Sequence, residues 1–388
     1  MNITTVGLLL AGLVLLIVGA EALVRGASKL AAAFGISPLV IALTVVAFGT
    51  SSPELAVGIK SALSGNADIA LGNVVGSNIF NILVIIGLSA VITPLVVAQR
   101  LVRWDVPLVI GLSFLVFFLG LSGSIGRVEG LLLFVGLVVY ITFTIRQSRK
   151  ESAAVQEEYA KEYHPERFKN LGQWAVNIGL LAGGLVMLVL GSNWLVNSAS
   201  SLARAIGVSE LVIGLTIVAI GTSAPELATS LMAAKRGERD IAVGNAIGSN
   251  LFNILGVLGI TAALAPNGIA VPRSAMAFDI PVMIAVAIAA LPVFFTGYSI
   301  SRLEGAIFLL YYVAYALFLL LDAVEHDLLP LYSTILFVFV IPITLLTLAI
   351  LVAREVRLRR RGGSLFKPET VPVADNLLLT AADNQRPG

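Results

Sequence analysis

Two short polar stretches, GTSSPEL at residues 49–55 and GTSAPEL at residues 221–227, interrupt long apolar segments of the chain. Each stretch places hydroxyl groups, a glutamate and a helix-breaking proline where the neighbouring residues are nearly all apolar. Irregular polar backbone inside an apolar segment is retained where it is buried in protein or lines a wet cavity. The two stretches therefore mark a candidate site within an apolar protein.

The composition places that site in a membrane. Of the 388 residues, 58% are hydrophobic and 12% are charged, whereas soluble domains carry roughly 25% charged residues. Many apolar runs exceed the roughly 18 residues that mark a bilayer-spanning helix. We predict an all-α polytopic membrane protein. The absence of cysteine excludes disulfides and thiolate metal sites, and the two histidines, His164 and His326, fall in expected polar connections.

Eleven membrane-spanning helices are expected. Their predicted bounds are residues 4–33, 37–63, 67–93, 104–122, 126–146, 174–205, 209–234, 240–265, 276–296, 302–322 and 329–353. The basic clusters QRLVR, KRGER and RLRRR then share one side of the membrane, opposite the acidic DAVEHD. Because basic clusters favour the cytoplasmic side, we expect the N-terminus outside, and the central loop and the C-terminus in the cytoplasm.

An internal repeat organises these spans. TVVAFGTSSPEL from Thr44 matches TIVAIGTSAPEL from Thr216, and DIALGNVVGSNIFNIL from Asp68 matches DIAVGNAIGSNLFNIL from Asp240, at a constant offset of 172 residues (240 minus 68). Each half holds five spans, and five is odd, so the second copy enters the membrane upside down. Inverted repeats of this kind are typical of secondary transporters, with the binding site near the midplane between the halves.

The repeat also predicts how the chain divides. The expected parts are a first inverted repeat of five helices (1–146), a cytoplasmic linker (147–173), a second inverted repeat of five helices (174–325), an additional transmembrane helix (326–355) and a disordered cytoplasmic tail (356–388).

Polar residues inside the spans point to a cation site made of oxygen atoms. Thr50 and Ser51 lie four and three residues before Glu54, so all three can face one locus. The third span of each half adds a row with four-residue spacing; the rows are Asn73, Ser77 and Asn81, and Asn245, Ser249 and Asn253. Calcium takes six to eight oxygen ligands and tolerates varied geometry. Neutral oxygens could suit sodium at flanking positions, whereas softer metals prefer Cys or His.

Structural interpretations remain alternatives at this stage. A glutamate within a span could be protonated or paired with a basic residue, and the Gly-Ser-Asn rows could serve helix packing. Asn78 and Asn250 are rotated by about 100° from the polar rows, so structural hydrogen bonding is at least as reasonable for them. Glu21 corresponds to Asn193 in the second half, and no site role is assigned to it.

The paired motifs GTSSPEL…GNVVGSNIFN and GTSAPEL…GNAIGSNLFN resemble the repeats of the cation/calcium antiporter superfamily, specifically the prokaryotic type of its sodium/calcium exchanger branch. The resemblance covers roughly residues 1 to 325. It implies ten core helices in two inverted five-helix repeats, with the ion sites formed by the second and third helices of each repeat. The family's metal ligands correspond here to the backbone carbonyls of Ala47 and Ala219 and to Thr50, Ser51, Glu54, Ser77, Asn81, Thr222, Ser223, Glu226, Ser249 and Asn253.

The resemblance also bears on the driving ion and on regulation. The proton-coupled calcium branch tends to carry a glutamate where this chain has Gly76 and Gly248, which favours sodium. A carboxylate at the position of Asn253 is linked to potassium transport in relatives, so Asn253 argues against potassium dependence. The central loop is too short for the calcium-sensing domains of animal exchangers, and the eleventh helix lies outside the ten-helix core.

Our hypothesis from the sequence is a sodium/calcium antiporter that exports calcium from the cytoplasm by alternating access. Calcium/proton exchange, with Glu54 or Glu226 protonated in the return step, is the first alternative. A cation channel and a membrane scaffold or receptor are the others. A channel commonly gathers its filter from several subunits, whereas two inverted halves in one chain can complete a site alone, which is compatible with a monomer.

The remaining expectations follow from this reading. The protein is a transporter and not an enzyme, and we expect no cofactor. Its partners are calcium ions, sodium ions and membrane lipid, with no nucleic acid among them. We place it as a multi-pass protein in the cytoplasmic (inner) membrane of a prokaryote.

Overall fold

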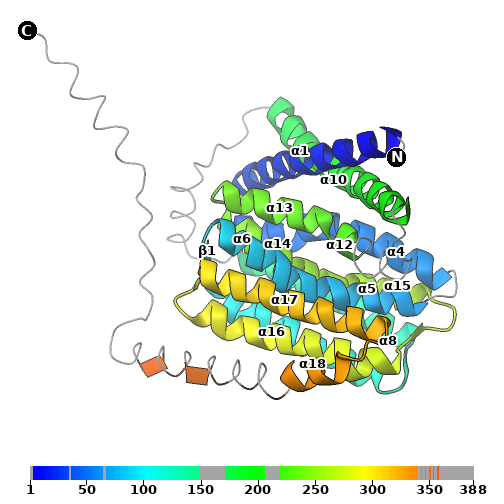
Figure 1. The fold of residues 1–388 in the computed structure, drawn as a ribbon. Coiled ribbons are helices and arrows are strands. Elements are labelled where there is room, and N and C mark those ends of the chain that lie inside the picture. The colour runs from blue at the N-terminus through cyan, green and yellow to red at the C-terminus, as the bar shows by residue number, and fades with distance from the viewer. Residues whose placement is uncertain are drawn as a thin grey trace, which may run out of the picture.

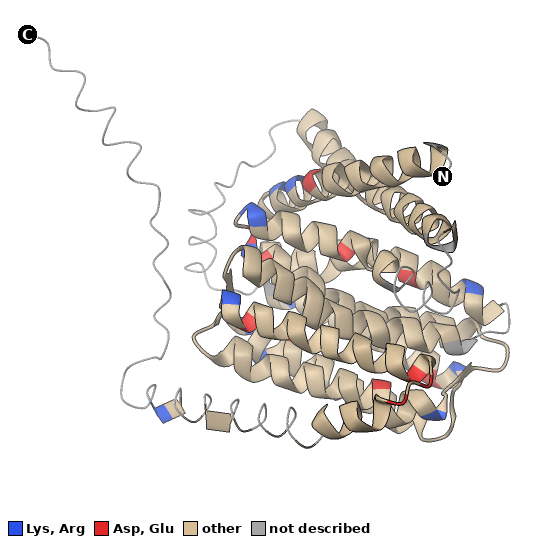
Figure 2. Cartoon of the chain, viewed as in Figure 1, with Lys and Arg blue, Asp and Glu red and all other residues tan. Residues whose placement is uncertain are grey.

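The computed structural model describes residues 3–34, 36–63, 67–148, 171–205 and 219–336, together with isolated positions between 338 and 357. Within these residues, eight helices are long and apolar enough to cross a membrane, and a bent pair brings the number to nine. Most charged positions lie at helix ends and in connections (Figure 2). The chain is therefore a polytopic helical membrane protein, as predicted.

The first part of the chain forms helices joined by short π-helical segments and two short strands. In chain order these are α1 (Ile3–Phe34), α2 (Pro38–Ile41), η1 (Ala42–Val46), α3 (Ala47–Thr50), α4 (Ser52–Leu63), α5 (Ala67–Phe80), η2 (Asn81–Ile86), α6 (Gly87–Ile92), β1 (Leu95–Val96), η3 (Leu101–Asp105), α7 (Val106–Gly120), β2 (Ser124–Ile125) and α8 (Arg127–Ser148), where η marks a π-helical segment.

The second part repeats this order where it is described. Its elements are α10 (Leu171–Ala205), α12 (Ala219–Thr222), α13 (Ala224–Lys235), α14 (Arg239–Phe252), η5 (Asn253–Leu258), α15 (Gly259–Leu264), β3 (Ile269–Ala270), η6 (Ala275–Asp279), α16 (Ile280–Phe295), β4 (Ser299–Ile300), α17 (Arg302–Ala323) and α18 (Leu329–Ile335). Asn81 opens η2 and Asn253 opens η5, so a local widening of the helix falls at equivalent places in the two halves. Single-turn π segments inside α-helices are frequent at functional sites.

The predicted spans agree with the observed helices, with small differences at their ends. The second span bends by 44° between Thr50 and Ser52, as expected from the Gly49–Pro53 block. Helix α10 begins at Leu171 and η3 at Leu101, each three residues before the predicted start. Gly172 and Gln173 in α10 and Arg103 in η3 interrupt the apolar pattern, so each helix begins before the hydropathy pattern does.

Some predicted segments lie outside the described residues. They comprise residues 206–218 at the start of the seventh span, residues 149–170 of the linker, most of the eleventh span after Ile335, and residues 358–388 of the tail.

Two spans form the interior of the bundle. In Arg239–Leu264, 83% of the apolar window is buried, and in Ile69–Ile92 the share is 72%, against at most 44% in the other candidate spans. These spans are α14–η5–α15 and α5–η2–α6, which contact each other and are covered by the remaining helices. The helices that carry the Gly-Ser-Asn rows are therefore the most enclosed part of the molecule.

The two halves are joined by crossed contacts. Strand β1 pairs antiparallel with β4, with Leu95 opposite Ile300, and β2 pairs antiparallel with β3, with Ser124 opposite Ala270. Among the helices, α6 contacts α17 and α15 contacts α8. In each case an element of one half binds an element of the other, so the halves interlock.

Helices α1 and α10 form a closely packed pair at one edge of the bundle, next to α13 (Figure 1). A Cβ added at Gly19 would lie 2.9 Å from the backbone oxygen of Gly184, and one at Gly191 would lie 2.8 Å from the backbone oxygen of Gly12. Glycine at these positions lets the two backbones approach closely, which is how small residues stabilise helix pairs in membranes.

Candidate ion-binding site

Two glutamates and two serines from the repeated motifs meet inside the bundle. The Ser51 hydroxyl donates to Glu226 Oε1 over 3.0 Å. In the mirrored bond, the Ser223 hydroxyl donates to Glu54 Oε1 over 3.1 Å. Each glutamate is only 1% exposed and both serines are fully buried. Each motif therefore binds the carboxylate of the other.

A break in each helix presents these side chains. Ser51 (φ −80°, ψ 9°) follows α3, and Ser223 (φ −88°, ψ 10°) precedes α13. Pro53 and Pro225 then fall in the first turn of the next helix, where a missing N–H is tolerated. The glutamate after each proline lies at the positive end of that helix, which favours its negative charge. The proline therefore both ends one helix and positions the acid at the start of the next.

Two asparagines from the enclosed helices bind the broken helices. Asn73 and Asn245 each donate from Nδ2 to the backbone carbonyl of the glutamate in their own half, over 3.4 Å and 3.2 Å respectively. Their side-chain oxygens accept from the opposite half. Asn245 Oδ1 accepts from the Thr50 hydroxyl at 3.2 Å, and Asn73 Oδ1 accepts from the Thr222 hydroxyl at 3.4 Å. Both threonine hydroxyls are thus held by the opposite repeat.

Four further asparagines join α5–η2 to α14–η5. Asn81 Nδ2 donates to Asn250 Oδ1 over 2.9 Å, and Asn253 Nδ2 donates to Asn78 Oδ1 over 3.2 Å. Asn250 also donates to the backbone oxygen of Asn78 at 3.3 Å. All four residues are at most 1% exposed. Because these bonds use the side-chain N–H groups of Asn81 and Asn253, they leave the side-chain oxygens of both residues available.

Several buried oxygens in this region have no hydrogen-bond partner among the described residues. They are Glu54 Oε2, Glu226 Oε2, Asn81 Oδ1, Asn253 Oδ1 and Ser249 Oγ. A buried polar atom without a partner costs about 1–3 kcal/mol, and it calls for an explanation such as an ion. Every atom in this set is oxygen, which is the ligand type that hard cations prefer.

The other predicted ligands lie beside this set. Ser77 Oγ lies 3.2 Å from Ser223 Oγ, which can accept from the Ser77 hydroxyl because its own O–H donates to Glu54. The carbonyl of Ala47 accepts its regular helical bond from the Ser51 N–H at 3.0 Å and lies 3.4 Å from the Thr50 hydroxyl. Ala219 is the first described residue of α12, which leads directly to Thr222. The role of these residues as metal ligands stays a prediction.

The donor set excludes a transition-metal site of ordinary type. Among the described residues, no group of three or more His, Cys, Asp or Glu side chains is arranged to hold a metal ion. Two carboxylates combined with neutral hydroxyl, amide and carbonyl oxygens are instead the ligand types of a hard cation that tolerates irregular geometry, such as calcium.

The site also includes two asparagines for which the sequence favours structural hydrogen bonding at least as much as ion binding, and one serine to which the motifs give no role. Asn78 and Asn250 hold the amides of Asn253 and Asn81, so they orient two of the predicted ligands. Ser230 accepts from Asn245 Nδ2 at 3.0 Å. The available signal for Ser230 was its position four residues after Glu226, which places both on one face of α13.

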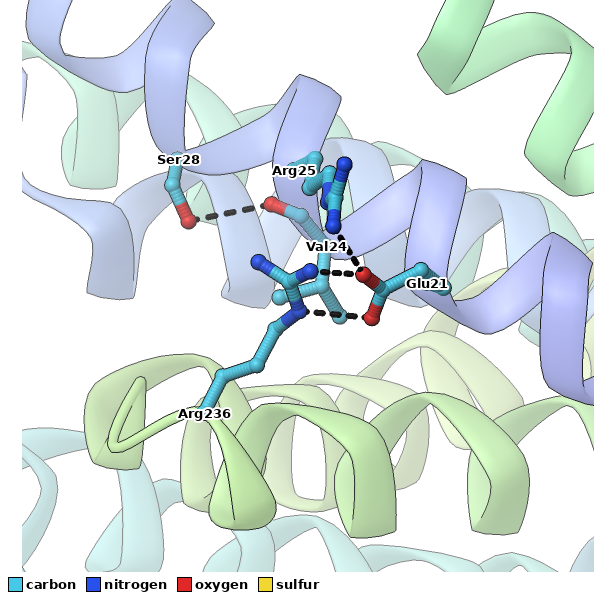
Figure 3. A network of polar contacts seen from close by, with 5 residues as sticks. All are labelled: Glu21, Val24, Arg25, Ser28 and Arg236. Atoms are coloured by element: carbon cyan, nitrogen blue, oxygen red, sulfur yellow. Dashed lines mark hydrogen bonds and ion pairs between the residues drawn. The ribbon is translucent and has the colours of Figure 1, made fainter.

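Glu21 lies outside this cluster and forms an ion-pair network between α1 and α13 (Figure 3). Its carboxylate accepts from Arg236 Nε over 2.6 Å and also pairs with Arg236 Nη2. Arg25, one turn further along α1, lies 2.6 Å from Glu21 Oε1. The network connects α1 to the C-terminal end of α13, and it takes no part in the oxygen cluster.

Comparisons with known proteins give this site its context. The family model described as sodium/calcium exchanger protein matches residues 4–146 and 176–321. Sodium/calcium exchanger MaX1 of Methanosarcina acetivorans is 31% identical over 340 residues, covering 79% of this chain and 96% of that protein. Inner membrane protein YrbG of Escherichia coli is 38% identical over 262 residues, covering 68% of this chain and 80% of that protein.

A solved structure agrees with these sequence relatives. The sodium-calcium exchanger NCX_Mj, soaked with 2.5 mM Na⁺ and 0.1 mM Ca²⁺, superimposes with a TM-score of 0.70 at 31% identity, covering 81% of this chain and 99% of that chain. The match by the family model extends over both halves and includes both polar motifs. The chain therefore belongs to the sodium/calcium exchanger family of membrane transporters.

Proposed function

We propose that this protein is a secondary antiporter that exports calcium from the cytoplasm in exchange for sodium. The observation that carries the proposal is the crossed pair of Ser–Glu bonds, which gathers two buried carboxylates at one locus, together with oxygens that have no partner in the described part of the chain. Two carboxylates match the double charge of calcium, and family membership supplies sodium as the exchanging ion.

The proposed ligands come equally from the two halves. They are the backbone carbonyls of Ala47 and Ala219 and the side chains of Thr50, Ser51, Glu54, Ser77, Asn81, Thr222, Ser223, Glu226, Ser249 and Asn253. The proposal is supported by the hydrogen bonds that join residues of this set across the halves, and by those oxygens that have no partner among the residues that the structure describes.

Shared ligands supply the coupling. Calcium needs both carboxylates, and sodium ions use the same oxygens, so the site holds one set of ions or the other. An empty site leaves two buried like charges uncompensated, which is strongly unfavourable in a low-dielectric interior. The site is therefore favoured to switch its exposure from one side of the membrane to the other only when ions are bound. Calcium export then requires sodium entry.

The proposed architecture is ten core helices in two inverted five-helix repeats, residues 1–146 and 174–325, with a cytoplasmic linker between them and an additional helix over 326–355. The mirrored contacts support it. In two halves related by a twofold axis, if an element of the first half contacts an element of the second, the two equivalent elements also contact each other. Strands β1–β4 and β2–β3 follow this rule, and so do the helix pairs α6–α17 and α15–α8.

Calcium/proton exchange remains the second candidate, and one packing feature speaks against it. The position at which proton-coupled relatives tend to carry a glutamate is Gly248 in the second half. A Cβ at Gly248 would lie 2.8 Å from Leu43 Cα and 3.0 Å from Ala47 Cβ. The structure therefore leaves no room for an additional acid at Gly248, whereas a Cβ at its first-half counterpart Gly76 would meet nothing within 4 Å. Because both positions are glycine, the proton would have to be carried by Glu54 or Glu226.

The decisive experiment is calcium uptake into proteoliposomes that contain the purified full-length protein. Vesicles loaded with sodium should take up calcium when diluted into sodium-free medium, and vesicles loaded with potassium should not. Potassium added to both sides of sodium-loaded vesicles should leave the uptake unchanged, because Asn253 stands where potassium-dependent relatives carry an acid.

Each contrary result selects another function. Uptake driven by an imposed pH step and indifferent to sodium would establish proton exchange. Calcium flux that needs no counter-ion on the far side would indicate a channel. Absence of calcium flux with sodium loading, with potassium loading and with an imposed pH step would reject transport of calcium altogether.

A further inference from the structure

The two ends of the oxygen cluster are not equivalent. One end contains Thr50, Ser51 and Glu226, and the other contains their counterparts Thr222, Ser223 and Glu54. At the first end, the Thr50 hydroxyl is fully buried and donates to Asn245 Oδ1 at 3.2 Å. At the second end, the equivalent bond from Thr222 is 3.4 Å long. The difference arises at the asparagines that accept these bonds, Asn245 for Thr50 and Asn73 for Thr222.

Asn245 is held by two acceptors. Its Nδ2 donates to the backbone carbonyl of Glu226 at 3.2 Å and to the Ser230 hydroxyl at 3.0 Å. Both N–H groups of the amide are therefore used, and the side-chain oxygen can point only toward Thr50. Asn245 and Ser230 are fully buried, so water does not compete for these bonds. Ser230, Asn245 and Thr50 form one continuous chain of hydrogen bonds.

Asn73, the counterpart of Asn245, has one such acceptor among the described residues, the carbonyl of Glu54 at 3.4 Å. The repeat offset places Gly58 where the second half has Ser230. A side chain at Gly58 is blocked, because an added Cβ would lie 2.7 Å from Thr261 Oγ1. The counterpart of Thr261 is the smaller Ser89. The asymmetry is therefore built into the sequence of both partners.

From this asymmetry we propose that Ser230 is a positioning residue, which fixes the Thr50 hydroxyl through Asn245 and so makes the Thr50–Ser51–Glu226 end the tighter of two flanking sodium positions. The inference rests on the proposed function, since it assigns sodium to the ends of the same cluster. A preorganised ligand binds more tightly because less conformational freedom is lost on binding. Ser230 itself need not touch the ion.

Ser230→Ala tests the proposal directly, with sodium-driven calcium uptake measured over a range of sodium concentrations. Loss of one buried hydrogen bond should raise the half-saturating sodium concentration about two- to tenfold, while the maximal rate stays within about twofold of the wild type. Ser230→Thr keeps the hydroxyl and should restore the wild-type value. A purely structural role would lower the maximal rate or the yield and leave the half-saturating concentration unchanged.

Thr229→Val is the matched control. Thr229 is equally buried and adjacent in α13, its hydroxyl has no partner among the described residues, and its first-half counterpart is Val57. The change removes a hydroxyl of similar depth without touching Asn245. It should leave the sodium dependence unchanged.

The reverse construction provides an independent test. Gly58→Ser combined with Thr261→Ala makes room for a serine beside Asn73, in the place that Ser230 takes beside Asn245 in the second half. This double variant should lower the half-saturating sodium concentration, whereas Thr261→Ala alone should not.

The outcomes separate the two levels of the argument. If the wild type shows no sodium-dependent calcium flux, the proposed function fails, and the assignment of sodium to these ends fails with it. If the wild type exchanges normally but Ser230→Ala and Gly58→Ser/Thr261→Ala both keep the wild-type sodium dependence, the positioning role is rejected and the exchanger function stands.

Discussion

At the scale of single residues, the site depends on which oxygen of each side chain is already used. Glu54 and Glu226 each accept a serine hydroxyl at Oε1 and keep Oε2 without a partner among the described residues. Asn81 and Asn253 donate through their amide N–H groups and keep their oxygens free in the same sense. Each of these four side chains thus keeps one oxygen without a partner among the described residues, which fits the proposed cation site.

Replacement of either glutamate by glutamine tests this arrangement. Glu54→Gln and Glu226→Gln retain the side-chain length and an oxygen that can accept from serine, but each removes one negative charge. We expect calcium affinity to fall by at least about tenfold, or about 1.4 kcal/mol, in either variant. Isothermal titration of the detergent-purified protein with calcium measures the loss. Asn177→Ala, a buried change in α10 away from the cluster, serves as control, and unchanged calcium binding in both glutamine variants would contradict the site.

At the scale of secondary-structure elements, two kinds of contact matter. The broken helices α3–α4 and α12–α13 carry the acids. The first turns of α4 and α13 are held by hydrogen bonds from the enclosed helices α5 and α14. The pair α1–α10 packs through glycines, and it carries none of the predicted ligands. The stability of that pair should therefore depend on backbone approach and on polar contacts at its edge.

Two neighbouring glycines of α10 separate close packing from helix propensity. A Cβ at Gly184 would lie 2.7 Å from the Leu23 N atom and 2.8 Å from the Gly19 backbone oxygen, whereas one at Gly183 would meet nothing within 4 Å. Gly184→Ala should destabilise the protein by about 1–3 kcal/mol through overpacking. Gly183→Ala should be neutral or slightly stabilising, because alanine favours helix. Thermal unfolding in detergent measures both, and equal midpoints for the two variants would argue against the packing shown here.

The ion pair between α1 and α13 is expected to be weak but measurable. Glu21 and Arg236 are both 29% exposed at the side chain, and partly exposed pairs typically contribute about 0.2–1 kcal/mol. A double-mutant cycle of Glu21→Gln and Arg236→Gln should give a coupling free energy in this range, again from thermal unfolding. The cycle of Glu21 with Arg25 stays within α1 and provides the comparison. A coupling of zero for Glu21 and Arg236 would show that the contact does not join the two helices in solution.

At the scale of the whole molecule, connecting segments of one half pair with connecting segments of the other half. The connection between α6 and α7 pairs with that between α16 and α17, and the connection between α7 and α8 pairs with that between α15 and α16. Paired connections must lie on the same side of the membrane, and α7 separates the two pairs. The crossed strands therefore determine which loops share a side, and the basic clusters predict which side is cytoplasmic.

The absence of cysteine makes this arrangement directly testable by labelling. Single cysteines at the exposed residues Ser122 and Asn267 should react with a membrane-impermeant maleimide added outside intact cells. Single cysteines at the exposed residues Gln99 and Lys235 should react only after the cells are opened. The cysteine-free parent protein is the control for background. Labelling of Ser122 and Asn267 variants from opposite sides would contradict the strand pairing, and reversal of all four would invert the predicted orientation.

Much of the fold was accessible from the sequence because it depends on local properties. The length of each apolar run predicts a span, and the proline of each motif predicts the break that the structure places at Ser51. The constant offset of 172 residues predicts equivalent roles for equivalent residues. The start of α10 at Leu171 differs from the predicted start because Gly172 and Gln173 interrupt the apolar pattern, and hydropathy reports contact with lipid and not helical hydrogen bonding.

By itself, then, the sequence determined the class of protein, the repeat and the two acids of the candidate site, since charge burial and motif repetition are visible in one dimension. Only the tertiary structure decided which hydroxyl holds which carboxylate, because Ser51 and Glu226 lie 175 residues apart in the chain and Ser223 and Glu54 lie 169 apart. It also decided which oxygens have no partner among the described residues, and that Ser230 binds Asn245 where the first half has only Gly58. Hydrogen bonds depend on distances of about 3 Å, and those distances arise only when the two halves interlock.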